Sequence, residues 1–279
     1  MTKRAGLFSA ERWRGEDGAA EGALMKTVFA TLVLASAAML VLDFRDMVDR
    51  AADAGMGTER SDPVIVEPPT DTDQERPYFP RAMPLAPGAK PPVMPGLTPK
   101  SAPKMVANRM TFDIDGSGTV SAVGRIEAGT GADFATFLQE NAGKAKRIWL
   151  HSSGGSLSDA LAMGRAIRKA KLDTAVPENA YCASSCPLVF AGGVAREAGR
   201  RTWIGVHQVY TLPGQTGTLG EGLANAQRIS AECQDYLAEM GADPRLWIHA
   251  MKTAKEKLYI FTPKELAEYR LVYKSVSKT

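Results

Sequence analysis

The stretch Leu150-His151-Ser152-Ser153-Gly154-Gly155-Ser156 joins a short apolar run to an amphipathic pattern. The run at residues 147–151 is typical of a strand, and the apolar positions of residues 156–171 recur with helical spacing. Further along the chain, strand patterns continue to alternate with helical patterns. This alternation predicts βαβ units and a largely parallel sheet, and therefore an α/β domain.

The same reasoning assigns the remaining elements of this domain. Strands are predicted at residues 110–115, 119–126, 173–176 and 201–206, and helices at 132–142, 184–191, 222–240 and from 262 onward. The domain begins near Met105, and the residues from 105 to 279 are enough for one core.

Three local signals lie between residues 148 and 210. Gly154-Gly155 allows a sharp turn that exposes backbone amides, which suit a negatively charged oxygen. The run Tyr181-Cys182-Ala183-Ser184-Ser185-Cys186-Pro187 places serines among small residues at a strand-to-helix corner. His207 follows the strand at residues 201–206. Each signal alone is more often structural, but together they are the parts of an acyl-transfer site.

Composition excludes several other classes of function. The formal net charge is +3 over 279 residues, which is too small to indicate nucleic-acid binding. The three cysteines contain no Cys-x-x-Cys pair and the three histidines are scattered, so we expect neither a metal site nor a cofactor.

The amino-terminal part predicts a membrane anchor at residues 23–42. This run is long enough to cross a bilayer, and its Lys26 can reach the headgroups. A cleaved signal peptide is the alternative, because residues 35–37 (Ala-Ser-Ala) resemble a cleavage site. The apolar run continues past that site, which favours an uncleaved anchor.

The distribution of charge around the anchor predicts its orientation. Lys and Arg are slightly more frequent before it, which puts residues 1–22 in the cytoplasm and the main domain in the periplasm. The expected location is therefore the inner membrane, with a single span.

Residues 43–104 are predicted to form a disordered linker. Positions 63–104 contain 12 of the 17 prolines in the chain. Proline lacks an amide donor and fixes φ, so we expect an extended spacer that lifts the domain off the membrane.

Residues 148–210 resemble the proteolytic subunit of the Clp proteases, within the ClpP/crotonase-like superfamily. The family's Ser-Pro-Gly-Gly turn, Gly-x-Ala-Ala-Ser-Met corner and His-Gln strand end are similar to residues 152–155, 181–185 and 206–208. Residues 262–272 resemble the family's closing segment more weakly. The resemblance implies a βαβ spiral fold and places the chain with membrane-tethered or periplasmic ClpP-like proteins.

The resemblance also implies roles for individual residues. Ser184 corresponds to the nucleophile, His207 to the general base, and the amides of Gly155 and Ser185 to the oxyanion hole. The position of the family's acid is occupied by Leu258, and the nearest acid is Glu256, which we take as a tentative substitute. The expected substrate is a short or unfolded peptide. Assembly of the chain into a homo-oligomer is a further expectation. No unfoldase partner is expected.

The cysteines leave three interpretations open. Cys182 and Cys186 flank Ser184, and a disulfide between them would rigidify its turn. Cys233 offers a rival pairing, and buried free thiols are the third interpretation. The α-carbons of a bonded pair must approach within about 7 Å.

Two further functions compete with a Ser-His hydrolase. The missing acid favours a weak or inactive module that binds peptides or assembles. A Ser-Lys peptidase that uses Lys144 or Lys146 as its base is the other alternative.

Overall fold

The computed structural model describes residues 17–53, 63–210, 219–272 and 274–275. The chain divides into two compact units, one up to Thr58 and one from Glu59 onward. The first 16 residues of the predicted cytoplasmic segment, and residues 54–62 of the predicted linker, lie outside the described residues.

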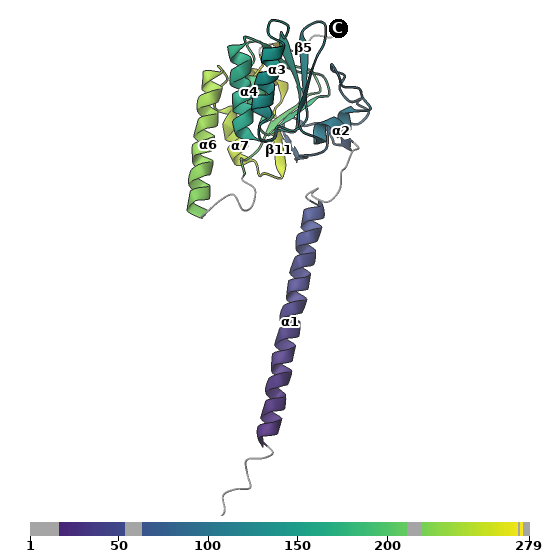
Figure 1. Cartoon of the computed structure of the whole chain (residues 1–279), viewed down its shortest axis with the longest axis vertical. Coiled ribbons are helices and arrows are strands. Elements are labelled where there is room, and N and C mark those ends of the chain that lie inside the picture. Colours follow the sequence, from purple (N-terminus) through teal and green to yellow (C-terminus); the bar gives the residue numbers. More distant parts are fainter. Residues whose placement is uncertain (1–16, 54–62, 211–218, 273, 276–279) are drawn as a thin grey trace, which may run out of the picture. The chain divides into compact units, whose positions relative to one another are not determined.

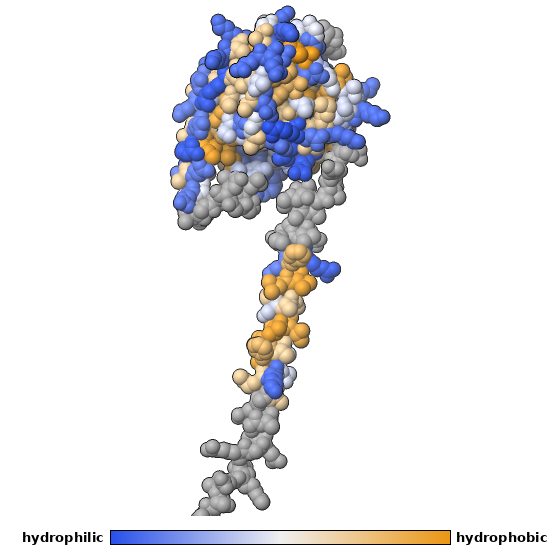
Figure 2. All heavy atoms as spheres, viewed as in Figure 1, coloured by the Kyte–Doolittle hydropathy of each residue, from blue (hydrophilic) through white to orange (hydrophobic). Residues whose placement is uncertain are grey.

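The first unit contains helix α1 (Asp17–Asp53). Its stretch Ala23–Arg45 is long and apolar enough to cross a membrane. Apolar side chains are exposed along this stretch, and Figure 2 shows the apolar band. The hydroxyls of Thr27 and Thr31 donate to helix carbonyls of Ala23 and Val28, at 2.8 Å in both cases. The polar groups of these threonines are therefore satisfied within the helix itself.

The second unit is built on a six-stranded sheet in the order β12-β9-β7-β6-β5-β4. All neighbouring pairs are parallel except β4 and β5, which form an antiparallel hairpin. The strands are β4 (Thr111–Ile114), β5 (Thr119–Val123), β6 (Arg147–His151), β7 (Asp173–Val176), β9 (Arg196–Ala198) and β12 (Lys274–Ser275). The expected α/β fold with a largely parallel sheet is confirmed.

The main core forms between one face of this sheet and a layer of helices. Side chains of β5 and β6 alternate between the faces, so that Ala122, Ile148 and Leu150 join the main core. Figure 1 shows α3 and α4 side by side in the helical layer. The helices of this unit are α3 (Thr130–Glu140), α4 (Leu157–Lys169), α5 (Cys186–Ala191), α6 (Leu219–Glu239), α7 (Leu246–Lys252) and α8 (Pro263–Glu268), with α2 described below.

A second sheet of four strands carries the order β2-β11-β10-β8. Its strands are β2 (Glu75–Pro77), β8 (Tyr181–Ala183), β10 (Trp203–Val206) and β11 (Lys257–Ile260). Strands β8 and β10 are parallel, and β11 is antiparallel to β10 and β2. A bridge between Ser152 and Cys182 links the ends of the two sheets.

The prediction of an extended spacer is wrong for residues 63–104. This segment forms strands β1 (Val64–Ile65), β2 and β3 (Pro84–Leu85), and helix α2 (Ala102–Ala107). Met83, Leu85 and Val106 are buried in a second core, together with Val123 on the face of β5 opposite the main core. The proline-rich segment is thus a layer of the domain.

The physical reason for this error lies in the residues between the prolines. Proline is tolerated on edge strands, and Pro77 ends the edge strand β2. Apolar residues such as Met83, Leu85 and Leu97 are spaced between prolines and fill the second core. Counting prolines alone therefore underestimated the apolar surface that this segment can bury.

Most predicted elements lie close to those observed. Ser156 caps α4 by accepting from the amide of Asp159, and Thr262 caps α8 in a capping box with Glu265. The sequence reading did not identify β9, β11 or α7, which are three, four and seven residues long.

Candidate active site

The corner at Ser184 joins β8 directly to α5. Ser184 has a φ of 62°, in the left-handed region that non-glycine residues rarely adopt. Its amide donates to the carbonyl of Gly205 on β10 at 3.0 Å. Ser184 is partly exposed, whereas Ala183 and Ser185 on either side are buried. The turn therefore presents one hydroxyl, that of Ser184, to the outside.

Cys182 and Cys186 are joined by a disulfide across this corner, with their α-carbons 5.1 Å apart. Cys233 is a buried free thiol. Burial raises the pKa of Cys233 to about 12, so this thiol stays protonated and unreactive at neutral pH. Of the pairings left open by the sequence, the structure therefore has the one that closes a short loop around Ser184.

His207 lies immediately after β10. Ser184 follows β8, so both residues lie at the carboxyl ends of neighbouring strands of the second sheet. Ala183 pairs with Gly205 in the parallel register of β8 and β10, so both strands end beside one another. His207 is only 3% exposed, and neither of its ring nitrogens has a hydrogen-bond partner among the described residues. The candidate nucleophile and base therefore follow neighbouring strands of the second sheet, and no hydrogen bond joins their side chains in this structure.

The glycine turn packs directly against the serine corner. Gly154 has a φ of 87°, and a Cβ added there would lie 2.9 Å from the amide nitrogen of Ser185. Neither the amide of Gly155 nor that of Ser185 donates a hydrogen bond within the described part of the chain. Two amides without a partner in this part of the chain therefore come from segments that pack against each other at Ser184, and free amides are the kind of donor that an oxyanion requires.

The position of the family's acid is apolar in three dimensions as well. Leu258 on β11 is 1% exposed and packs with Tyr181 and Trp203. The carboxylate of Glu256 lies 3.7 Å from the ammonium group of Lys255, with the Glu256 side chain 66% exposed. Glu256 is close enough to His207 to favour its protonated form, but it makes no hydrogen bond to the ring.

Burial dominates the electrostatics of the candidate base. It lowers the pKa of His207 to about 4, against weaker opposing effects of the Lys255 backbone and the Glu256 charge. The ring is therefore neutral at pH 7 and has a lone pair available to accept a proton.

Tyr78 is a site residue that the sequence reading missed. Its ring centroid lies 4.3 Å from that of His207, and its hydroxyl donates to the carbonyl of Ser153 at 2.7 Å. Burial raises the pKa of the Tyr78 phenol, and the nearby Ser184 side chain partly offsets this effect. The only signal in the sequence is one aromatic residue between prolines, inside the segment that the sequence predicts to be a spacer.

The Ser-Lys alternative is inconsistent with the structure. Lys144 and Lys146 are exposed and come just before β6. Ser184 and the glycine turn follow the carboxyl ends of β8 and β6, respectively. Because the two lysines lie at the opposite end of β6, neither can act as the base for Ser184.

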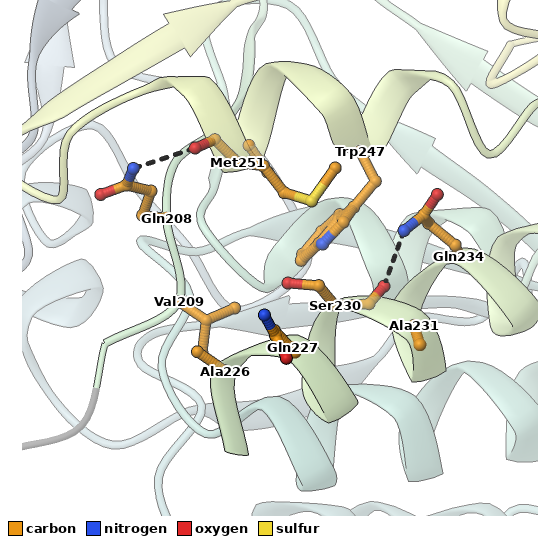
Figure 3. Close-up of a pocket in the computed structure, with 10 residues that line it drawn as sticks. Gln208, Val209, Ala226, Gln227, Ser230, Ala231, Gln234, Trp247 and Met251 are labelled. Carbon is orange, nitrogen blue, oxygen red and sulfur yellow. Dashed lines mark hydrogen bonds between the residues drawn. The ribbon is translucent and has the colours of Figure 1, made fainter. Parts of the chain in front are cut away.

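A cavity of about 440 Å³ lies between α6 and α7, next to the segment that follows His207. Gln208 and Val209, which directly follow His207, contribute to its lining. Figure 3 shows the Trp247 indole between the two helices, with Gln208 bonded to the carbonyl of Met251 at 2.9 Å. The cavity offers space for a side chain of a bound molecule, and the residues directly after His207 form part of its wall.

Comparisons with known proteins give matches among solved structures. No protein-family model matches the chain, and no curated protein matches it. The chain is similar to a mutant of ClpP1 from Listeria monocytogenes, at 16% identity over 58% of this chain and 92% of that chain, with a TM-score of 0.46. It is also similar to a mutant of a membrane-bound stomatin-specific protease, at 17% identity over 57% of this chain and 77% of that chain, with a TM-score of 0.43.

Proposed function

We propose that this protein is a membrane-anchored serine hydrolase, a peptidase that acts through an acyl-enzyme at Ser184. One observation carries the proposal. A partly exposed serine in a left-handed turn lies beside a neutral histidine and two free amides, all at one sheet edge. This is the set of groups that acyl transfer needs.

The mechanism follows from the roles of these groups. The Ser184 oxygen attacks the peptide carbonyl carbon while His207 accepts the hydroxyl proton. The amides of Gly155 and Ser185 donate to the oxyanion, and the C–N bond breaks as His207 returns the proton to the leaving amine. Water then attacks the ester by the same route and releases the acid and free Ser184.

Substrate binding has to bring Ser184 and His207 into hydrogen-bond contact. Catalytic hydrogen bonds are often absent or long in free enzymes and shorten once substrate is bound. Gly155 is exposed, so a peptide can reach its amide. The cavity between α6 and α7 would hold a side chain of that peptide.

Membrane attachment and orientation belong to the same proposal. The stretch Ala23–Arg45 has 23 residues and would extend about 35 Å, against a hydrocarbon core of about 30 Å. The slight excess of Lys and Arg before it favours a cytoplasmic amino terminus. The Cys182–Cys186 disulfide is typical of an oxidising compartment such as the periplasm.

The test is covalent labelling of the full chain in detergent micelles with a fluorophosphonate probe. We expect labelling of the wild type, and its loss in Ser184→Ala and His207→Ala. Ser158→Ala, which changes an exposed serine on α4, should label like the wild type. An unlabelled but correctly folded wild type would contradict the proposal.

The second candidate is a catalytically inactive module that binds peptides. The buried Leu258 in the position of the acid favours it, as do the unpartnered nitrogens of His207. Peptide binding without any labelling of Ser184 would support this second function. Assembly into a homo-oligomer is a separate prediction that light scattering of the solubilised chain tests.

A further inference from the structure

The imidazole of His207 lacks the carboxylate that usually orients a catalytic histidine. Val206 pairs with Tyr259 in the antiparallel register of β10 and β11, which sets His207 opposite Leu258. Leu258 is buried and apolar, and Glu256 is turned toward Lys255. Within the described residues, the ring must therefore be held by something other than a hydrogen bond to an acid.

Tyr78 makes the closest aromatic contact with this ring. The two ring centroids are 4.3 Å apart, with an angle of 38° between the ring planes. The other aromatic neighbour, Tyr210, is 5.8 Å away and 45% exposed. Packing against Tyr78 restricts the tilt of the imidazole. It occupies neither ring nitrogen, and the Lys255 backbone lies near enough to favour the protonated ring.

Tyr78 is itself held at several points. Its amide donates to the Glu256 carbonyl at 2.9 Å, which continues the pairing of β2 with β11. Its hydroxyl donates to the Ser153 carbonyl at 2.7 Å. Two residues later, the Pro80 carbonyl accepts from the Ser153 hydroxyl at 2.8 Å and from Arg125 at 3.3 Å. Tyr78 is thus fixed between the candidate base and the glycine turn, which contains one of the two candidate oxyanion amides, that of Gly155.

We propose that Tyr78 is a positioning residue that holds the His207 imidazole by ring packing, in the place of the missing carboxylate. This inference rests on the proposed hydrolase function. In this arrangement one ring nitrogen faces no competing partner and can take the Ser184 proton. The phenol ring also keeps water away from the imidazole.

The titratable surroundings of His207 define a readout that a purely structural role would not change. The groups that face the ring are the phenols of Tyr78 and Tyr210 and the carboxylate of Glu256, while the Lys255 ammonium lies 5.9 Å from the Tyr210 ring. Burial is the main reason that the pKa of His207 is low. Removing the Tyr78 ring admits water, so the pKa of His207 should rise toward its ordinary value of 6.5.

The experiment compares three variants of the full chain in detergent micelles. Tyr78→Phe keeps the ring, Tyr78→Ala removes it, and Tyr210→Ala removes the more distant ring as a matched control. Fluorophosphonate labelling of Ser184 is followed as a function of pH, and the His207 ring is titrated by NMR. Tyr78→Leu, which keeps apolar bulk, replaces Tyr78→Ala if the latter does not fold.

We expect Tyr78→Phe, which keeps the ring but loses the hydrogen bond to the Ser153 carbonyl, to label more slowly than the wild type and faster than Tyr78→Ala. Tyr78→Ala should label about a hundredfold more slowly at pH 7, as expected for a misplaced catalytic group. It should also raise the pKa of His207 by at least about one unit. Tyr210→Ala should change both quantities far less. Faster labelling of Tyr78→Ala would mean that Tyr78 blocks the site, and would overturn the inference.

The two proposals fail in different ways. If the wild type labels but Tyr78→Ala labels equally fast, the role of Tyr78 is wrong and the hydrolase stands. If the folded wild type does not label, the hydrolase fails. The NMR titration then still decides whether Tyr78 packs against the His207 ring and shields it from water. An unchanged pKa of His207 in Tyr78→Ala would contradict this role of Tyr78.

Discussion

Gly154 lies so close to Ser184 that a Cβ on the glycine would stand 2.6 Å from the Cβ of the serine. The same added atom would be 2.4 Å from the Ala183 carbonyl oxygen. Both neighbours are short and fixed, so neither can move aside cheaply. The close packing of the glycine turn and the serine corner thus depends on a residue without a side chain.

Gly154→Ala should therefore damage both stability and the site. Left-handed backbone costs a non-glycine residue about 1–2 kcal/mol, and the overpacking adds about 1–3 kcal/mol. We expect the free energy of unfolding to fall by about 2–5 kcal/mol, with labelling of Ser184 nearly lost. Urea denaturation followed by circular dichroism measures the first effect.

Gly88 provides the matched control. It also has a positive φ, of 70°, but an added Cβ would meet nothing within 4 Å. Gly88→Ala should lose only the backbone term, about 1–2 kcal/mol, and keep its labelling. Equal losses in the two variants would show that the contact with Ser184 is unimportant.

The Cys182–Cys186 disulfide should stabilise the corner that carries Ser184. Closing so short a loop stabilises a folded chain by about 2 kcal/mol in the chain-entropy model. We expect a reductant to lower the free energy of unfolding by that amount and to slow the labelling of Ser184. The Cys182→Ala/Cys186→Ala double variant should show no response to the reductant.

Cys233→Ala separates this effect from that of the free thiol. Because Cys233 is buried and unbonded, its replacement should leave the response to reductant intact. A response that disappears in Cys233→Ala would instead implicate a pairing that involves Cys233.

The fold was largely predictable because local patterns carry it. The strand before Gly154, the helix after Ser156 and the cap at Thr262 each follow from short-range rules. Strand β9 was not predicted because it is only three residues long and contains the charged residues Arg196 and Glu197, which give no apolar strand pattern. Its pairing depends on tertiary context. The layer at residues 63–104 was missed because its burial depends on contacts with distant strands such as β11.

The candidate site was predictable only in part for a similar reason. Ser184 and His207 each end a strand, and parallel pairing brings such ends together. Tyr78 reaches the same place from a segment 129 positions before His207, through the pairing of β2 with β11. No local pattern around Tyr78 encodes that pairing.

Glu265 ties this amino-terminal layer to the end of the domain. Its carboxylate accepts from the Tyr259 hydroxyl at 2.5 Å and from the Thr262 amide at 2.9 Å, and also from the Gln74 side chain. Gln74 lies just before β2, four residues before Tyr78. Weakening this network should release the segment that covers His207.

Glu265→Gln should lower the free energy of unfolding by about 2 kcal/mol, because charge-assisted hydrogen bonds are replaced by an imperfect set. Trypsin should then cleave faster after Arg81, which is followed by Ala82, and mass spectrometry of the fragments identifies this cut. Glu268→Gln, an exposed change on the same helix, should leave both measurements unchanged. Identical cleavage rates in the two variants would count against a role of the Glu265 hydrogen bonds in holding the segment around Tyr78.

Two buried histidines should make the protein less stable in mild acid. Burial lowers the pKa of both His151 and His207 to about 4, from an ordinary value of 6.5. Between these values the unfolded chain binds more protons than the folded chain, so stability is present above pH 6.5 and is lost as the pH falls toward 4. Each histidine should cost about 2 kcal/mol of unfolding free energy between pH 7 and pH 5.

His207→Gln isolates the share of the candidate base, because glutamine does not titrate. The variant should lose less stability than the wild type between pH 7 and pH 5, by about 2 kcal/mol. Urea midpoints measured at half-unit pH steps provide the comparison. Parallel curves for the two proteins would mean that His207 is hydrated and titrates near 6.5 in the folded state, in which case burial by Tyr78 would not control it.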